Sequence, residues 1–113
     1  MNLNRNLSFA EFWPYYLAQH SRPATRWVHL AATLAWLALL AAALSARTWW
    51  LLAAIPVVAY GLAWFSHFFL ERNRPATFRY PLLSLLADHK MAFLMLTGGM
   101  ARELERRQIQ PHR

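Results

Sequence analysis

Charged and titratable side chains are almost absent from two stretches of the chain, and this pattern predicts two membrane-length helices. Residues 27–46 are 20 positions with one member of the Asp, Glu, Lys, Arg and His set, His29. Residues 48–70 are 23 positions with one such residue, His67. Roughly 20 predominantly apolar residues are needed for a helix to cross a bilayer. The sequence therefore predicts an all-α membrane protein with two spans.

The connection between the two spans is too short for anything except a tight turn. Only Arg47 and Thr48 separate the apolar runs, so the two helices are predicted to form an antiparallel hairpin. The alternative is a buried hairpin inside a soluble helical bundle. The remaining residues are too few to cover two helices that are apolar on every face, so the membrane hairpin is favoured.

The segment before the hairpin has the pattern of an amphipathic helix over residues 8–21. Ser8 and Glu11 have the spacing of a capping box, and apolar residues recur at helical intervals from Phe9 to Leu17. We expect an interfacial helix that lies on the membrane surface. Pro14 allows a second start point, because proline is favoured at the first position of a helix.

A third apolar stretch, residues 80–100, follows a polar connector with two prolines. Asp88, His89 and Lys90 interrupt it at its centre. A lipid-exposed span does not tolerate three such side chains in a row. The segment is therefore expected to be a third span with its Asp88 side against protein, a re-entrant segment, or a helix at the interface. Residues 101–113 form a charged tail that is expected to be solvated, and residues 1–113 are treated as one domain.

Composition and charge narrow the class further. The chain of 113 residues is 58% hydrophobic and 15% charged, which excludes a disordered protein. It has no Cys, so thiolate metal ligands and a Cys nucleophile are excluded. The formal net charge of +7 comes from arginines near the span ends, so we assign it to membrane topology and predict no nucleic-acid partner.

The distribution of arginine also predicts an orientation. Basic residues precede the first span and follow the second, whereas Arg47 stands alone in the turn; the flanking residues are Arg5, Arg22, Arg26, Arg72, Arg74 and Arg79. The two termini of the hairpin are therefore expected on the cytoplasmic side. The predicted location is the inner membrane in a bacterium or the endoplasmic reticulum in a eukaryote.

The histidines of the two spans are predicted to lie at one depth. His29 and His67 are 18 and 20 residues from Arg47, which corresponds to roughly 27 and 30 Å along a helix. His20 lies in the connector to the same end, and Glu71 follows His67 by one helical turn. Asp88 and His89 are close enough to the start of the third segment to reach the same region. These side chains are predicted to converge at the cytoplasmic end of the hairpin.

Imidazoles and carboxylates without thiolates suit iron, zinc, copper or manganese. Several histidines with a carboxylate and open positions are typical of non-haem Fe(II) sites that activate oxygen. Each residue also has a plainer interpretation: His29 as a hydrogen-bonded interfacial histidine, His67 with Glu71 as a polar pair, and Asp88 in an ordinary ion pair. The shared depth favours the metal interpretation.

Three sequence blocks resemble the small Mpo-like membrane proteins, in their short bacterial-type form. These blocks are Tyr-Leu-Ala-Gln-His-Ser-Arg-Pro with Arg-Trp-Val-His at residues 16–29, His-Phe-Phe-Leu-Glu-Arg-Asn-Arg-Pro-Ala-Thr-Phe-Arg-Tyr-Pro-Leu at 67–82, and Asp-His-Lys-Met at 88–91. The family includes the fungal 2-hydroxy fatty acid dioxygenase of phytosphingosine metabolism. The resemblance implies Fe(II)-dependent α-oxidation, in which a 2-hydroxy fatty acid and O2 give a fatty acid one carbon shorter.

The resemblance also implies roles for single residues. His20, His29 and His67 correspond to the family's iron-binding histidines. Glu71 and Asp88 fall on motif positions and are expected to be catalytic, as ligands or as groups that orient the ligands. Independently of the resemblance, positive charge near the predicted site makes Arg74 and Arg26 the expected partners of the substrate carboxylate. His89 departs from the family pattern and is a candidate extra ligand.

Two other functions remain open at this point. One is a non-catalytic membrane protein that binds lipid or a protein partner through the hairpin. The other is a histidine-based metalloenzyme that acts on a different hydroxy lipid. The expected partners of the enzyme are a lipid-derived 2-hydroxy acid, O2 and membrane lipid, and formation of a homo-oligomer is left open.

Overall fold

The computed structural model describes residues 7–110, and every regular element in that range is helical. The order is α1 (Phe9–Gln19), α2 (Pro23–Ala46), α3 (Leu51–Phe65), the π-helical turn η1 (Ser66–Glu71), the 3₁₀ turn η2 (Ala76–Phe78), α4 (Pro81–Thr97) and α5 (Met100–Arg106). The predicted all-α class is confirmed.

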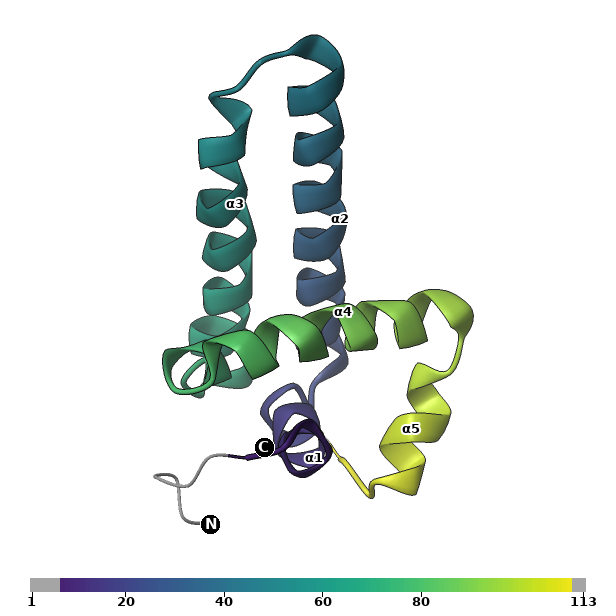
Figure 1. Ribbon diagram of the computed structural model, residues 1–113. Coiled ribbons are helices and arrows are strands. Elements are labelled where there is room, and N and C mark those ends of the chain that lie inside the picture. Colours follow the sequence, from purple (N-terminus) through teal and green to yellow (C-terminus); the bar gives the residue numbers. More distant parts are fainter. Residues whose placement is uncertain (1–6, 111–113) are drawn as a thin grey trace.

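Helices α2 and α3 form the antiparallel hairpin that the sequence predicted (Figure 1). Arg47 ends α2 in the left-handed conformation, with φ at 52°, and α3 begins at Leu51. The turn is therefore longer than predicted, because residues 48–50 bond to the chain around them instead of continuing a helix. Helix α2 also begins earlier than predicted, at Pro23, whose fixed φ suits the first position of a helix.

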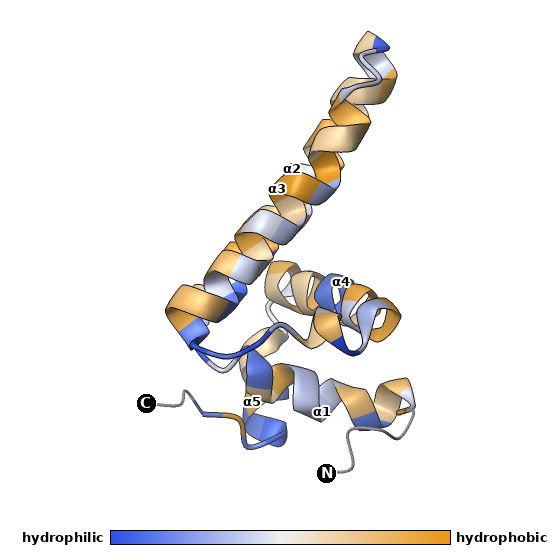
Figure 2. Ribbon diagram, turned by 90° about the vertical axis from the view of Figure 1, so that its left-hand side faces the viewer, coloured by the Kyte–Doolittle hydropathy of each residue, from blue (hydrophilic) through white to orange (hydrophobic). Residues whose placement is uncertain are grey.

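The hairpin leaves most of its apolar surface uncovered by protein. Two helical segments in the described range are long and apolar enough to cross a membrane: Pro23–Ala46, with a mean hydropathy of 1.9, and Leu51–Glu71, with 1.6. Only 28% and 17% of their most apolar windows are buried inside the protein. Figure 2 shows apolar residues along most of the hairpin. Such low burial is not what the soluble-bundle alternative predicts, because a core helix is covered on most faces.

Helix α4 lies across the lower end of the hairpin and does not run alongside it (Figure 1). The third apolar stretch is therefore not a span parallel to α2 and α3. Its three central polar residues all have protein contacts: Asp88 faces Tyr16 and His29, His89 meets Trp36, and the Lys90 ammonium lies 4.5 Å from the Trp13 ring centre. Of the three alternatives, a third span beside the other two is therefore wrong, although the Asp88 side does face protein, and the re-entrant and interfacial alternatives remain open.

Helix α1 packs beneath α4 and supplies most of the core. It begins at Phe9 with the predicted capping box in place: Ser8 accepts from the Glu11 amide, and Glu11 accepts from the Ser8 amide. The alternative start at Pro14 is wrong. The apolar face is buried against protein, not laid on a lipid surface as the sequence indicated; its fully buried residues are Phe12, Trp13, Tyr16 and Leu17.

Helix α5 returns the chain to α1, so the region predicted to be a solvated tail is partly packed. Gly98 ends α4 with φ at 82°, a conformation that glycine adopts without strain. The buried Glu103 carboxylate then accepts a hydrogen bond from the Trp13 indole at 2.6 Å and pairs with Arg106. Residues 111–113 of the predicted tail lie outside the described range.

This carboxylate should make the packing of α5 sensitive to acid. Hydrogen bonds from Arg106 and Trp13 lower the pKa of Glu103 from its ordinary value of 4.5 to about 2. A lowered pKa stabilises the fold above pH 4.5, and that contribution is lost as the pH falls toward 2. Glu103→Gln should therefore lower the free energy of unfolding at pH 7 by about 1–2 kcal/mol. The difference from the parent should vanish near pH 2.

Chemical unfolding in detergent at several pH values, followed by Trp fluorescence, checks this prediction. The exposed Glu105→Gln is the matched control and should have little effect. A loss of stability in Glu103→Gln that stays constant from pH 7 to pH 2 would contradict the assignment.

Candidate metal centre

Three buried histidines from three different elements meet at the lower end of the hairpin. His20 follows the last residue of α1, His29 lies in the second turn of α2, and His67 lies in η1. Their ring centres are 4.4, 4.5 and 5.1 Å apart, and one nitrogen of each ring lies within 4.8 Å of the other two. The predicted shared depth of His29 and His67 is confirmed.

Each of the three rings has its Nδ1 atom beside an oxygen atom. The His20 Nδ1 is 2.7 Å from the Tyr16 carbonyl oxygen, the His67 Nδ1 is 2.7 Å from the Asn73 side-chain oxygen, and the His29 Nδ1 is 3.4 Å from Asp88. Oxygen acceptors place the ring proton on Nδ1 and leave the lone pair on Nε2. This arrangement is typical of metal-binding histidines, whose second nitrogen is held by a carboxylate or a carbonyl.

The Nε2 atoms are then available for a cation. In the described part of the chain, the Nε2 atoms of His20 and His29 are buried and have no hydrogen-bond partner. Burying a polar atom without a partner is costly, so two such atoms facing a third imidazole fit the donor set of a metal ion. Burial, followed by the neighbouring His29 and His67, holds the pKa of His20 well below its ordinary value, which keeps this ring in the neutral form that binds metals.

The π-helical turn η1 gives His67 its position. It continues α3 from Ser66 to Glu71 and ends at Arg72, which is left-handed with φ at 62°. The Asn73 amide then bonds back to the His67 carbonyl at 2.9 Å, and the Asn73 side-chain amide donates to the Gln19 carbonyl at 3.0 Å. Both bonds orient Asn73 so that its side-chain oxygen faces His67. Single π-helical turns are often found at functional sites.

Glu71 holds the connector between α1 and α2. Its fully buried carboxylate accepts hydrogen bonds from the Ser21 amide at 3.0 Å, the Arg22 amide at 3.0 Å and the Thr25 hydroxyl at 2.6 Å, and also from the Ser21 hydroxyl. Both carboxylate oxygens are thus engaged with donors at the start of α2. The structure places Glu71 as the group that fixes His20 and His29 relative to His67, and not among the converging donor atoms.

Asp88 lies beside the histidines and is one quarter exposed. It accepts a hydrogen bond from the Tyr16 hydroxyl, whose pKa is raised well above its ordinary value by burial and then by Asp88 itself. Tyr16 therefore stays protonated as a donor. Asp88 borders a narrow space between the three histidines, which we call the chamber and which is also lined by Tyr16, Ala63, Ala76, Thr77 and Ser84. Asp88 also borders a larger cavity beside the chamber.

The other three predicted site residues lie away from the converging nitrogens. Arg26 is buried and donates to the carbonyls of His20 and Ser21 at 2.8 and 2.9 Å, so it braces the connector. Arg74 is exposed in the loop after η1 and does not line the chamber. Both ring nitrogens of His89 are engaged, with the Leu85 carbonyl and the Trp36 indole, so an extra ligand at His89 is not supported.

Several residues of the site were not identified from the sequence. Asn73 and Thr25 act through hydrogen bonds that only the tertiary structure reveals. Ser84 lines the histidine chamber, and its buried hydroxyl has no hydrogen-bond partner within residues 7–110. Tyr16 precedes His20 by one helical turn and stacks on its ring. This spacing can be read from the sequence and indicates that the two side chains are neighbours. Ser84 has the same relation to Asp88 on α4.

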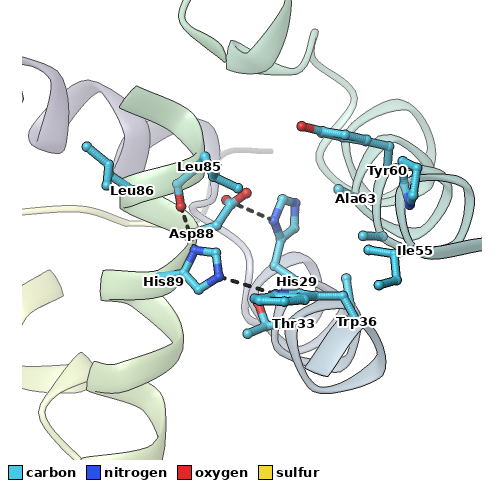
Figure 3. Close-up of a pocket in the computed structure, with 13 residues that line it drawn as sticks. His29, Thr33, Trp36, Ile55, Tyr60, Ala63, Leu85, Leu86, Asp88 and His89 are labelled. Carbon is cyan, nitrogen blue, oxygen red and sulfur yellow. Dashed lines mark hydrogen bonds and ion pairs between the residues drawn. The ribbon is translucent and has the colours of Figure 1, made fainter. Parts of the chain in front are cut away.

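A larger, partly open cavity of about 530 Å³ adjoins the chamber (Figure 3). Its walls come from α2 between His29 and Trp36, from α3 between Ile55 and Ala63, and from α4 between Leu85 and His89. His29, Ala63 and Asp88 border both spaces. We call the larger space the groove.

A comparison with protein families identifies the chain. A family model described as 2-hydroxy-palmitic acid dioxygenase Mpo1-like matches residues 6–100. The chain belongs to the Mpo1-like family. The matched range contains all three histidines, η1 and the whole of α4. No curated protein and no solved structure matches the chain. The predicted resemblance is thus confirmed over most of the chain, and the family name suggests a dioxygenase.

The geometry predicts which histidines are needed for metal binding. Detergent-purified protein should bind about one divalent cation, such as Co(II), per chain at the three imidazoles. His20→Ala, His29→Ala and His67→Ala should each lose it, because every ring supplies one of the three donor atoms. His89→Ala should keep it. Equilibrium dialysis with elemental analysis measures the bound metal, and unchanged binding in any of the first three variants would contradict the site.

The acceptors on Nδ1 should also affect affinity. Asn73→Ala removes the oxygen that orients His67 but leaves all three ligands in place. Loss of such an orienting group typically weakens metal binding about 10- to 100-fold. Titration with a competing chelator measures the affinity, and Arg74→Ala, in the same loop, serves as the control that should leave it unchanged.

Proposed function

We propose that this Mpo1-like protein is an Fe(II)-dependent dioxygenase of the membrane that acts on 2-hydroxy fatty acids. The observation that carries the proposal is the cluster of three buried imidazoles, of which two have their Nδ1 atoms held by hydrogen bonds and the third has its Nδ1 3.4 Å from Asp88. Among the described residues, the Nε2 atoms of His20 and His29 have no partner. The family description supports the reaction class and the substrate class.

The donor set is compatible with a redox-active metal, and the reaction class requires one. Three imidazoles without thiolates suit iron, copper, zinc and other divalent ions, and a dioxygenase requires an ion that can react with O2. Iron is therefore our choice of metal. When bound, Fe(II) supplies electron transfer to O2 and open positions for the hydroxyl and carboxylate oxygens of the substrate.

The overall reaction needs no further reductant. A 2-hydroxy acid and O2 balance with a fatty acid one carbon shorter, CO2 and water. Cleavage of the bond between C1 and C2 releases four electrons from the acid, and these four electrons reduce O2. Because the acid is the only electron donor required, a site with room for the metal, the acid and O2 is sufficient.

Residues around the chamber have separate tasks in this proposal. Asp88 accepts the proton of the substrate hydroxyl, because its carboxylate borders both the chamber and the groove. Tyr16 holds Asp88 in place through its hydroxyl. Glu71 positions the three histidines and keeps the chamber closed to water by joining η1 to the start of α2.

For the substrate carboxylate we propose a partner other than the predicted Arg26 and Arg74. Arg26 and Arg74 do not border the chamber, and one Arg26 nitrogen is already bonded to two carbonyls. Ser84 does border the chamber, and its hydroxyl is buried without a partner. We therefore assign Ser84 as a hydrogen-bond donor to the carboxylate, with the arginines supplying positive charge near the chamber.

The proposed location is a membrane with the metal centre near the cytoplasmic surface. The hairpin has exposed apolar sides along its length, and its far end carries the exposed Trp49 and Trp50. The metal centre lies at the opposite end, among Arg22, Arg26, Arg72, Arg74 and Arg79. An excess of arginine is typical of the cytoplasmic side of a span.

The direct test of the proposal is turnover by iron-loaded protein. Detergent-purified chain loaded anaerobically with Fe(II) should convert 2-hydroxypalmitate and O2 to pentadecanoate and CO2, as measured by mass spectrometry and an oxygen electrode. His29→Ala should abolish turnover, whereas Arg47→Ala, at the far end of the hairpin, should retain it. Palmitate without the hydroxyl group should not react.

Two outcomes would overturn the proposal in different ways. Iron-loaded protein that consumes no 2-hydroxy acid of any chain length would exclude this substrate class and favour another hydroxy lipid. Protein that binds no metal under any reconstitution would favour a non-catalytic lipid- or partner-binding protein.

A further inference from the structure

The groove beside the histidine chamber has polar groups mainly at the end next to the metal centre. His29 and Asp88 lie at that end, where the groove and the chamber adjoin (Figure 3). The walls beyond them are mainly small or apolar, with Ala32, Ile55 and Ala59 contributing from the two hairpin helices. Sites for amphipathic molecules have this form, with an apolar cavity and a few polar groups at one end.

The long direction of the groove follows the hairpin. It extends along α2 from His29 to Trp36 and along α3 from Ala63 to Ile55, which corresponds to roughly 10–12 Å at the rise of an α-helix. A molecule with its polar group at the chamber therefore points its apolar part along the hairpin. In a membrane this is the direction of the neighbouring lipid tails.

The rim of the groove is apolar and uncovered. Leu85 and Leu86 of α4 are 45% and 51% exposed, and Tyr60 of α3 is 37% exposed. The groove lies on the hairpin side of α4, whereas α1 lies on the other side (Figure 1). With the hairpin in a bilayer, this rim faces hydrocarbon, so a lipid tail can enter the groove sideways without crossing water.

A hydrogen bond between α2 and α4 fixes one wall. The Trp36 indole donates to His89 Nε2 at 3.2 Å, and His89 Nδ1 is bonded to the Leu85 carbonyl at 2.7 Å. Figure 3 shows this pair beside His29 and Asp88. His89 thus acts as a positioning residue that ties α4 to the hairpin next to the groove.

We propose that the groove is a lateral acyl site that takes one acyl chain of a membrane-dissolved acid directly from the bilayer. The identity of the acid's polar group rests on the proposed function. The position of its acyl chain is inferred separately, from the shape and lining of the groove. The groove length of roughly 10–12 Å is shorter than one half of a hydrocarbon core of about 30 Å. The end of a long chain therefore lies among lipid tails, and the protein contacts only the part nearest the polar group.

Photo-crosslinking tests this placement directly. The probe is 2-hydroxypalmitate with a diazirine in the half of the chain nearest the carboxylate, added to metal-loaded protein in phospholipid vesicles. Mass spectrometry should locate its adducts at Trp36, Ile55, Ala59 and Tyr60. The same diazirine in a phospholipid tail should label outward-facing positions such as Val57, which is 73% exposed.

A matched pair of substitutions on α3 sharpens the test. Ala59→Phe fills the groove, whereas Val57→Phe adds an aromatic ring on the exposed side of the same helix. A side chain that overfills a packed site lowers the occupancy of the groove by the acyl chain about tenfold or more. Labelling in the groove should therefore fall by that factor in Ala59→Phe and stay unchanged in Val57→Phe. The metal content of each variant shows whether it folds. If Ala59→Phe does not fold, Ile55→Trp, at the far end of the groove, repeats the test.

The outcomes separate the groove from the reaction. Adducts in the groove with no product would leave the acyl site in place and overturn the proposed reaction. Product formation with adducts spread evenly over the outer surface, or with labelling unchanged in Ala59→Phe and Ile55→Trp, would overturn the acyl site. Crosslinks between two chains at the groove would assign it to a second copy and would also overturn the proposal.

Discussion

The hydrogen bonds of the buried Glu71 carboxylate join the segments that carry the three histidines. Glu71 stands at the end of η1 and accepts hydrogen bonds from Ser21, Arg22 and Thr25, which lie about 50 positions earlier in the chain. A buried charge without partners is strongly unfavourable, so this carboxylate is stable only when the connector is docked against it. Docking the connector places His20 and His29 beside His67, and three distant segments become one site.

Docking of the connector against Glu71 also explains why one end of the hairpin is polar and the other is apolar. The connector and η1 meet at the lower end of the hairpin together with Arg22 and Arg72, and α4 and α1 cover the buried histidines there. The upper part of the hairpin has no such cover. The proposed substrate, an acid with a polar group and a long tail, matches this division, because His29 and Asp88 border the groove at the polar end and the groove leads into the apolar region.

Much of this architecture could be predicted from the sequence, because span length and helical rise are local properties. The hairpin follows from two apolar runs with a short turn, and the shared depth of His29 and His67 follows from counting residues from Arg47. The crosswise position of α4 could not be predicted in this way. Periodicity shows that Asp88 needs a protein partner but does not identify Tyr16 and His29 as that partner.

The roles of single polar residues were also beyond the sequence. Glu71 and His89 have side chains that bind metals elsewhere, and only tertiary contacts show that one fixes the connector and the other bonds Trp36. Arg26 was expected at the substrate but braces the connector carbonyls. Asn73 lies in the sequence block after His67, yet its amide gives no sign, before folding, that it orients the ring.

X-ray absorption spectroscopy of the iron-loaded protein tests the central claim most directly. The account predicts a first coordination sphere with three imidazole nitrogens, at about 2.0–2.2 Å as in other metal–histidine bonds, and no sulfur. The remaining ligands should be oxygen atoms that a 2-hydroxy acid displaces. A spectrum with one imidazole or none, or with oxygen ligands alone, would show that the three histidines do not share a metal ion and would contradict the account.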